Sequence, residues 1–388
     1  MATEIGRGRF ARRAYGLDEV ALVPGAVSID PELVDVGWAW ASRKFGLPVL
    51  AASMDAVVDP PFAAEMTRLG GLAVLNLGGV QTRYENPQDA ISQIISCPVE
   101  HAVATIQRVY SAPVKEELIL KRIAEMRELG AGVVVSATPA EALRAAQAVG
   151  AGKIDVFVVQ ATITTARHIS HRATNVLSFE QMADIVQAPV IVGNCVSYEG
   201  AIELMQAGAN GVLVGVGPGA QCTTRRVLGI GVPQVTAIAD VAAARRDHEA
   251  ATGKRVAVIA DGGMRVGGAI SKAVACGADA VMLGTSLTMA REAPGRGYQW
   301  GMATSDAALP RGTRIEVGIA GALEEILLGP SHTEDGSMNL IGGLRLAMAS
   351  CGAANLREMQ KAELVVAPTL LTEGKAHQRQ QHVGHGRD

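Results

Sequence analysis

The chain has 388 residues, of which 48% are hydrophobic and only 3% aromatic, with 44 glycines and a formal net charge of -3. This composition predicts a layered α/β protein with an aliphatic core and many tight turns, and it argues against an all-β sandwich. Because no basic run is interleaved with aromatics and no apolar run could span a bilayer, we expect a cytoplasmic protein with neither a nucleic-acid nor a membrane partner.

Eight short runs of apolar and β-branched residues recur along the chain, and each is followed by turn residues and a helical pattern. The runs occupy residues 48–52, 72–76, 132–136, 155–159, 189–193, 211–215, 256–260 and 280–284. Buried parallel strands connected by helices have this pattern. We therefore predict a single (β/α)8 TIM barrel over residues 48–376, preceded by an N-terminal segment over residues 1–47. An open doubly wound sheet is the alternative that the same alternation allows.

Three segments lie outside the strand and helix repeat. Residues 79–129 follow the second strand, carry a helical pattern over 115–129, and are too short to hold an inserted regulatory domain. Residues 292–339 follow the eighth strand; because they are polar, rich in glycine and long for a loop, we interpret them as an active-site flap. The last segment, 377–388, is rich in Gln, His and Gly and is expected to form a flexible tail.

The five cysteines lack the paired spacing that zinc sites and disulfide frames require. We expect free thiols, most of which are small buried apolar groups. They are Cys97, Cys195, Cys222, Cys276 and Cys351.

One cysteine stands in a setting that favours chemistry. In a TIM barrel the active site lies at the C-terminal ends of the strands, and the sixth strand leads into GVGPGAQCTTR, residues 215–225. This loop holds Cys222 in a glycine-rich turn beside Thr224 and Arg225, where a cation and peptide dipoles favour the reactive thiolate. On spacing alone, an incidental cysteine in a glycine-rich turn or in a phosphate cradle is the alternative. Cys195, which has no such neighbours, is the second candidate.

The seventh and eighth strands end in glycine turns that suit a phosphorylated ligand. The backbone amides of Gly262, Gly263, Gly284 and Thr285 can converge on an anion, and Asp261 can accept hydrogen bonds from vicinal hydroxyls. We therefore expect a phosphorylated sugar or a nucleotide. The alternative is that Asp261 caps the next helix and that the glycines serve packing.

Two further strand ends carry candidate ligand contacts. Met54 follows the first strand and can lie against a flat base, and Asn194 follows the fifth strand and can hydrogen-bond a substrate. Both side chains are equally compatible with packing at the rim of the barrel.

Together these loops resemble the inosine-5′-monophosphate dehydrogenase and guanosine-5′-monophosphate reductase family. The matches run in order over most of the chain: YGLDEVALVPG at 15–25, SMD at 53–55, GPGAQCTTR at 217–225, GVPQVTAI at 231–238, IADGG at 259–263, MLGT at 282–285 and EAPG at 292–295. The resemblance implies that Cys222 attacks C2 of a purine, that hydride passes to or from a nicotinamide cofactor, and that Thr224 helps to activate water or the leaving group.

The resemblance also assigns binding roles. It implies that Asp261 holds the ribose hydroxyls and that the glycine turns hold the 5′-phosphate, within a homo-oligomer that is a tetramer or octamer. The other implied substrate contacts are Met54, Asn194, Gly262, Gly263, Gly284, Thr285, Tyr298, Gly301 and Met302. The implied cofactor contacts are Gln160, Thr162 and Gly215, and the implied potassium ligands are the backbone carbonyls of Gly217, Gly219 and Cys222.

The chain departs from the family pattern at four places. It has no room for the two cystathionine-β-synthase modules of most family dehydrogenases. Ala220 replaces the phosphate-binding serine, and Gln160-Ala-Thr162 replaces a cofactor-binding Asp-Ser-Ser. The flap has Arg311-Gly312 where dehydrogenases use an Arg-Tyr pair to activate water, and Val317-Gly318 where the reductase needs a glutamate.

These departures resemble a short, module-free branch of IMP dehydrogenases. We therefore expect NAD-dependent oxidation of IMP to XMP, with Arg311 or Arg314 as the base. One alternative is NADPH-dependent reduction of GMP to IMP and ammonia. The other is a non-catalytic, regulatory protein that binds purine nucleotides.

Overall fold

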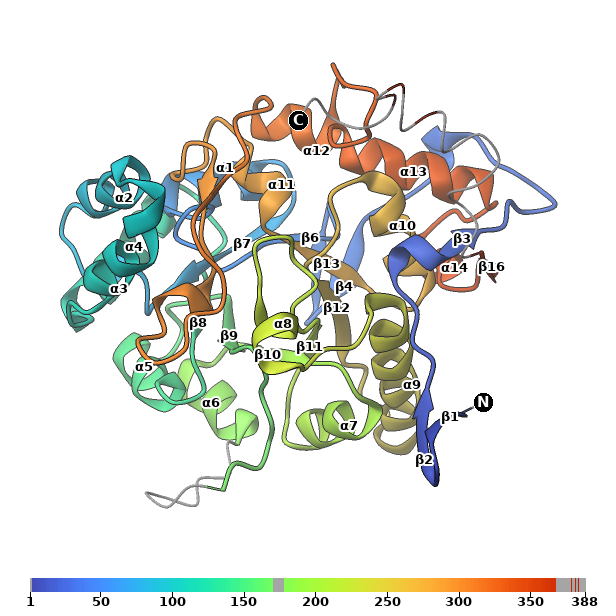
Figure 1. Cartoon of the computed structure of the whole chain (residues 1–388), viewed down its shortest axis with the longest axis horizontal. Coiled ribbons are helices and arrows are strands. Elements are labelled where there is room, and N and C mark those ends of the chain that lie inside the picture. The colour runs from blue at the N-terminus through green and yellow to red at the C-terminus, as the bar shows by residue number, and fades with distance from the viewer. Residues whose placement is uncertain (1, 170–177, 368–377, 379–380, 382, 384–388) are drawn as a thin grey trace.

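The computed structural model of the chain describes residues 2–169, 178–367, 378, 381 and 383 (Figure 1). Its centre is a closed parallel barrel with the strand order β10-β11-β12-β13-β6-β7-β8-β9. The strands are β6 (Val49–Ala51), β7 (Leu72–Asn76), β8 (Val134–Ala137), β9 (Val156–Gln160), β10 (Val190–Cys195), β11 (Gly211–Val214), β12 (Ala257–Asp261) and β13 (Ala280–Leu283). The predicted TIM barrel is confirmed, and the open sheet is wrong, because β13 pairs with β6 and β9 with β10.

Helices follow the barrel strands and cover the outside of the barrel (Figure 1). They are α1 (Pro60–Arg68), α4 (Glu116–Glu128), α5 (Ala142–Val149), α6 (Phe179–Val186), α7 (Tyr198–Gln206), α9 (Gln234–Thr252), α10 (Gly267–Ala275) and α13 (Leu340–Ser350). The sequence determines where these helices begin and which side they bury. Asp59 caps α1 by accepting a hydrogen bond from the Phe62 amide at 2.9 Å. Helix α9 buries Ala237, Val241 and Ala244, which are spaced so that they lie on one side of the helix.

A hairpin covers the N-terminal end of the barrel. It consists of β4 (Trp38–Trp40) and β5 (Arg43–Phe45). The rings of Trp38 and Trp40 stack with centroids 5.7 Å apart, and the indole of Trp40 donates to the carbonyl of Asn210, which directly precedes β11. The opposite, C-terminal mouth is the end at which TIM barrels carry their sites.

The segment between β7 and β8 is helical, as its pattern over 115–129 predicted. It holds α2 (Pro87–Ser96) and α3 (Ala102–Tyr110) before α4. The segment after β13 contains α11 (Thr285–Thr288), β14 (Tyr298–Gln299), β15 (Ile315–Glu316) and α12 (Leu323–Leu328). No separate regulatory domain is inserted in the described part of the chain.

The remaining elements are short and lie outside the barrel repeat. They are β1 (Ala2–Gly6), β2 (Arg9–Arg12), β3 (Val20–Leu22), α8 (Thr224–Leu228), α14 (Leu356–Met359) and β16 (Leu364–Val366), with short 3-10 turns at Leu17–Glu19, Pro31–Leu33, Val80–Thr82, Val99–His101 and Met302–Ser305. Within the described residues, no helix has the length and apolarity that crossing a membrane requires. The tail predicted at 377–388 falls mostly outside the described residues.

Candidate active site

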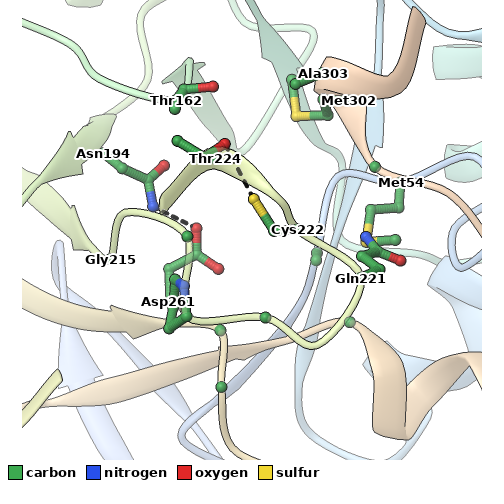
Figure 2. Close-up of a pocket in the computed structure, with 18 of the residues that line it drawn as sticks. Met54, Thr162, Asn194, Gly215, Gln221, Cys222, Thr224, Asp261, Met302 and Ala303 are labelled. Atoms are coloured by element: carbon green, nitrogen blue, oxygen red, sulfur yellow. Dashed lines mark hydrogen bonds between the residues drawn. The ribbon is translucent and has the colours of Figure 1, made fainter. Parts of the chain in front are cut away.

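A cavity of about 550 Å³ opens at the C-terminal mouth of the barrel (Figure 2). The loops after six barrel strands and the flap contribute its walls. Of the site residues selected from the sequence, it is lined by Met54, Gln160, Thr162, Asn194, Gly215, Gly217, Gly219, Cys222, Thr224, Asp261, Gly262, Gly263, Gly284, Thr285, Gly301, Met302 and Arg311. The structure therefore brings most of the selected residues to one cavity, and leaves Tyr298, Arg314 and Cys195 outside its lining.

The loop between β11 and α9 holds Cys222 at the cavity wall. Its thiol is half-buried and hydrogen-bonds the hydroxyl of Thr224, with Sγ and Oγ1 3.1 Å apart; Thr224 is fully buried at the start of α8. Figure 2 shows the two side chains pointing toward each other. In this bond the thiol donates to the hydroxyl oxygen. Once the thiol has lost its proton, the hydroxyl can donate to the sulfur, and the thiolate is the form that acts as a nucleophile.

Arg225 has a different role from the one expected of it. Its guanidinium donates at 2.9 Å to the carbonyls of Val216 and Val232 and so ties the two ends of the cysteine loop together. Burial lowers the pKa of Arg225, although the nearby thiol of Cys222 opposes this shift. The arginine therefore acts as a clamp on the loop backbone.

Asp261 is the buried polar centre of the cavity. Its carboxylate accepts hydrogen bonds from the Asn194 amide at 2.6 Å and from the Gln160 amide at 3.1 Å. Burial raises the pKa of Asp261 to about 6, and these two bonds act against that rise. Because α10 begins after Val266 without a side-chain cap, the alternative that Asp261 caps this helix is wrong. The two amides instead hold the carboxylate at the wall of the cavity.

The two glycines after Asp261 support the cysteine loop. Both have positive φ, +78° at Gly262 and +80° at Gly263, and a Cβ at Gly263 would lie 3.0 Å from the Cβ of Pro218. The amide of Gly262 donates to the carbonyl of Met282 at 3.3 Å, which leaves it less available to an anion than the sequence suggested. Close packing against Pro218 is therefore one role of this pair.

The flap contributes Arg311 to the cavity. Its guanidinium lies 3.4 Å from the Asp306 carboxylate and donates to the carbonyl of Leu309 at 3.1 Å, while its Nε is buried with no partner in the described structure. Arg314, the other candidate base, donates to the carbonyls of Ile94, Ile95 and Cys97 and lies over the ring of Tyr298. Neither Arg314 nor Tyr298 lines the cavity.

Among the lining residues that the sequence analysis missed, two stand next to a recognised motif. Gln221 precedes Cys222, lies beside Met54 (Figure 2), and has a buried carbonyl oxygen without a partner in the described structure. Arg265 follows the IADGG match, is exposed at the cavity, and forms no ion pair among the described residues. An orphaned acceptor and an unpaired cation are the signals that ligand contacts leave in a protein.

The second candidate thiol is less suited to reaction. Cys195 is 5% exposed, its sulfur lies 3.5 Å from the carbonyl of Ser197, and burial raises its pKa. All five cysteines are free. In the described part of the chain, no group of three or more His, Cys, Asp or Glu side chains could hold a metal ion.

The carbonyls proposed for potassium belong to the cysteine loop. Carbonyl oxygens are donors that potassium prefers, and Gly217 turns the chain with a φ of +66°. The Gly219 carbonyl already accepts the Cys222 amide at 3.1 Å. One lone pair of that oxygen remains for a cation, so the donor chemistry fits.

Comparisons with known proteins show the family to which this chain belongs. A family model described as IMP dehydrogenase / GMP reductase domain matches residues 14–377. An uncharacterized oxidoreductase of Mycolicibacterium smegmatis is 40% identical over 374 residues, covering 94% of this chain and 99% of its own. A crystal structure of an IMP dehydrogenase/GMP reductase-like protein from Corynebacterium glutamicum has a TM-score of 0.87 and 38% identity, covering 94% of this chain and 97% of that chain.

A more distant relative shows which form of the family this chain represents. The inosine-5′-monophosphate dehydrogenase of Methanocaldococcus jannaschii is 27% identical over an alignment of 482 residues, longer than the 388 residues of this chain. The archaeal enzyme therefore carries additional sequence, whereas the mycobacterial relative matches nearly end to end. Membership of this family also implies a nucleotide ligand. The chain is an oxidoreductase that belongs to the IMP dehydrogenase/GMP reductase family.

Proposed function

We propose that this protein oxidises IMP to XMP with NAD, through a covalent purine adduct on Cys222. One observation carries the proposal: the Cys222 thiol and the Asp261 carboxylate line the same cavity, and the thiol is hydrogen-bonded to the buried side chain of Thr224. A nucleophile and an acceptor for ribose hydroxyls in one cavity fit a nucleoside whose base is attacked.

In the proposed reaction, IMP, NAD and water give XMP, NADH and a proton. The Cys222 sulfur bonds to C2 of the hypoxanthine ring and the C2–H bond breaks; the Thr224 hydroxyl lies where it can hydrogen-bond the thiolate before the attack and again when the thiolate is released. Gln160 and Thr162 would hold NAD, which would supply the acceptor for the hydride that leaves C2. Water then bonds to C2, the carbon–sulfur bond breaks, and the thiolate is restored. Arg311, in its neutral form, takes a proton from that water.

The supporting residues are those already placed at the cavity. Gln160 and Thr162 lie on the wall after β9 and suit the nicotinamide ribose, because an amide and a hydroxyl can both bond its hydroxyl groups. The backbone carbonyls of Gly217, Gly219 and Cys222 are proposed to bind potassium. We also propose that the protein assembles into a homo-oligomer.

Substituting Arg311 with lysine should separate the two halves of the reaction. We expect a rapid burst of NADH followed by turnover about 100-fold slower than in the wild type, because the base acts only on the water. Stopped-flow absorbance measures both phases. Arg296→Lys is the matched control, since Arg296 lies on the same flap but bonds Ser92 outside the cavity. Equal slowing of the burst and the steady state would remove Arg311 from this role.

Arg265 should supply charge to the 5′-phosphate in place of the hydroxyl that Ala220 cannot offer. We expect Arg265→Ala to raise the KM for IMP roughly tenfold, because a bond between guanidinium and phosphate is charge-assisted. Arg226→Ala, which removes an exposed arginine near the cysteine loop but outside the cavity, should leave KM unchanged. If both substitutions raise KM equally, the cause is the loss of positive charge near the cavity and not a contact between Arg265 and the phosphate.

The function itself is tested by a small matrix of substrates. Purified protein is mixed with IMP or GMP and with NAD, NADP or NADPH, with and without potassium, and NADH absorbance and XMP are followed. NADH and XMP from IMP and NAD support the proposal. Consumption of NADPH with GMP would show a reductase, and nucleotide binding without any turnover would show a binding protein.

A further inference from the structure

The helices α2 and α3 form a small apolar cluster of their own, separate from the barrel core, and the flap enters it. Trp300 of the flap is 2% exposed there. Its buried neighbours come from the first barrel loop, from the turn after β7, and from the two helices: Ala56, Val80, Ala90, Ile91, Ile94, Ile106 and Val109. Burying an indole of this size fixes the flap at one point against the body of the protein.

A chain of hydrogen bonds crosses this cluster. The Trp300 indole donates to the Tyr110 hydroxyl at 2.8 Å, and that hydroxyl donates to the Asp55 carboxylate at 2.5 Å. The other carboxylate oxygen accepts the Val80 amide at 3.1 Å. A Cβ at Gly79 would lie 2.1 Å from this carboxylate, so only glycine leaves room for Asp55 here.

Burial affects the protonation of the groups in this chain of hydrogen bonds. It raises the pKa of Tyr110 well above its ordinary value, so the phenol stays protonated and remains a donor. Burial also raises the pKa of Asp55 to about 6. Removing the phenol oxygen would leave a buried indole N–H and a buried carboxylate without their partner, which is costly in a region that excludes water.

The chain of hydrogen bonds links the first barrel loop, which holds Asp55, to the flap, which holds Trp300. The two segments meet at the cysteine loop. Asp55 directly follows Met54, and Trp300 directly precedes Gly301, and both Met54 and Gly301 line the cavity. Each of them also approaches the Gln221 amide: its nitrogen is 3.9 Å from the Met54 sulfur and would be 3.3 Å from a Cβ at Gly301. Gln221 is the residue before Cys222.

Two more side chains fasten the flap to the same helices. Gln107 of α3 donates to the carbonyl of Asp306 at 3.0 Å, and the Arg314 guanidinium donates to three carbonyls at the end of α2. Between these two anchors lies Arg311, the flap residue that reaches the cavity. The helices therefore hold the flap on both sides of the residue proposed to activate water.

We propose that α2 and α3 form the dock of the flap and that Tyr110 is a positioning residue, which acts through Trp300 and Asp55 to hold Gly301 and Arg311 at the cysteine loop. The dock occupies the stretch between β7 and β8. The effect on turnover rests on the proposed function, whereas the docking itself is a property of the folded chain and is measured without substrate.

The test compares Tyr110→Phe with Tyr84→Phe by hydrogen exchange of the backbone amides. Tyr84 packs against the same cluster, and its hydroxyl donates only to the Val109 carbonyl at 2.8 Å, so it is a matched control. We expect exchange over residues 300–314 to be about tenfold faster or more in Tyr110→Phe, and unchanged in Tyr84→Phe. Trp300→Phe, which removes the donor at the other end of the chain, should loosen the same residues.

Steady-state kinetics give the second reading. Tyr110→Phe should lower kcat about tenfold while KM for IMP changes less than about twofold, because the flap finishes the reaction and the purine cavity is intact. Unchanged exchange over 300–314 in Tyr110→Phe, or equal loosening by Tyr84→Phe, would overturn the dock. If the wild type turns over neither IMP nor GMP, the proposed function fails, and the exchange measurement still decides whether Tyr110 docks the flap.

Discussion

Replacing Cys222 with alanine is expected to lower turnover of IMP by about 10⁴-fold or more and to abolish the covalent adduct. Cys222 is the one thiol among the described residues that line the cavity, and the loss of a nucleophile removes the whole covalent pathway rather than part of a binding energy. The measurement is initial-rate NADH absorbance together with the intact mass of the protein after quenching with acid.

Cys195→Ala is the control for the Cys222 substitution. Cys195 ends β10 beside Asn194, but it is buried and its pKa is raised, so it is a poor nucleophile. We expect turnover in Cys195→Ala within about threefold of the wild type, since a buried cysteine behaves as a small apolar residue. If turnover survives in Cys222→Ala but disappears in Cys195→Ala, the nucleophile is Cys195 and the assignment to Cys222 is wrong.

Asp261→Ala should weaken the binding of IMP about 100-fold or more. The carboxylate is held by Asn194 and Gln160 in a position to accept two ribose hydroxyls, and each bond to a charged acceptor inside a cavity is strong. Removing it also leaves two amide donors without their acceptor. Isothermal calorimetry with IMP alone measures this loss without any turnover.

The same carboxylate predicts how binding depends on pH. In the free protein the pKa of Asp261 is raised to about 6 by burial, and the hydroxyl donors of a ribose prefer the ionised carboxylate. Bound nucleotide therefore lowers this pKa, so affinity should be highest above pH 6 and should fall about tenfold per unit below it.

Asp59→Asn is the control for this pH dependence. Burial also raises the pKa of Asp59 to about 6, but its side chain caps α1 away from the cavity, and asparagine is an equally good cap. The pH profile of IMP binding should be unchanged in Asp59→Asn and flat in Asp261→Ala. A profile that follows Asp59 instead would place the titrating group outside the site.

The barrel could be predicted from the sequence because its strands are buried on both faces. Residues 156–159 are continuously apolar, a pattern that is typical of a strand covered on both faces. The ends of the strands differ from the predicted ranges. Strand β8 begins two residues later than predicted, and β10 ends two residues later than predicted, at Cys195. Strand ends depend on which hydrogen bonds neighbouring strands supply, and one strand's sequence does not record them.

The cavity could be predicted where function requires particular residues in short motifs. Cys222, Asp261 and Gly263 stand in such motifs, and the topology of a barrel brings strand ends together without further information. Arg225 shows the limit of this reasoning. Its closeness to Cys222 in sequence suggested an electrostatic role, but a glycine-rich loop exposes backbone carbonyls, and the guanidinium bonds those instead.

The docking of the flap could not be predicted at all. Tyr110 and Trp300 are 190 residues apart, and neither belongs to a periodic pattern or a motif. Their contact depends on how α3 packs on α2, which is decided by side-chain shape across the interface. Arg314 is a similar case: it looked like a candidate base because of its position near Arg311, and it instead bonds the end of α2.

The central claim is that Cys222 carries the purine during NAD-linked oxidation of IMP. The most direct test mixes the protein with IMP and NAD, quenches the reaction with acid within the first turnover, and locates any added mass by peptide analysis. We predict that the mass of the nucleotide appears on the peptide containing Cys222 at the same rate as NADH. NADH formed without an adduct, or an adduct on another residue, would contradict the account.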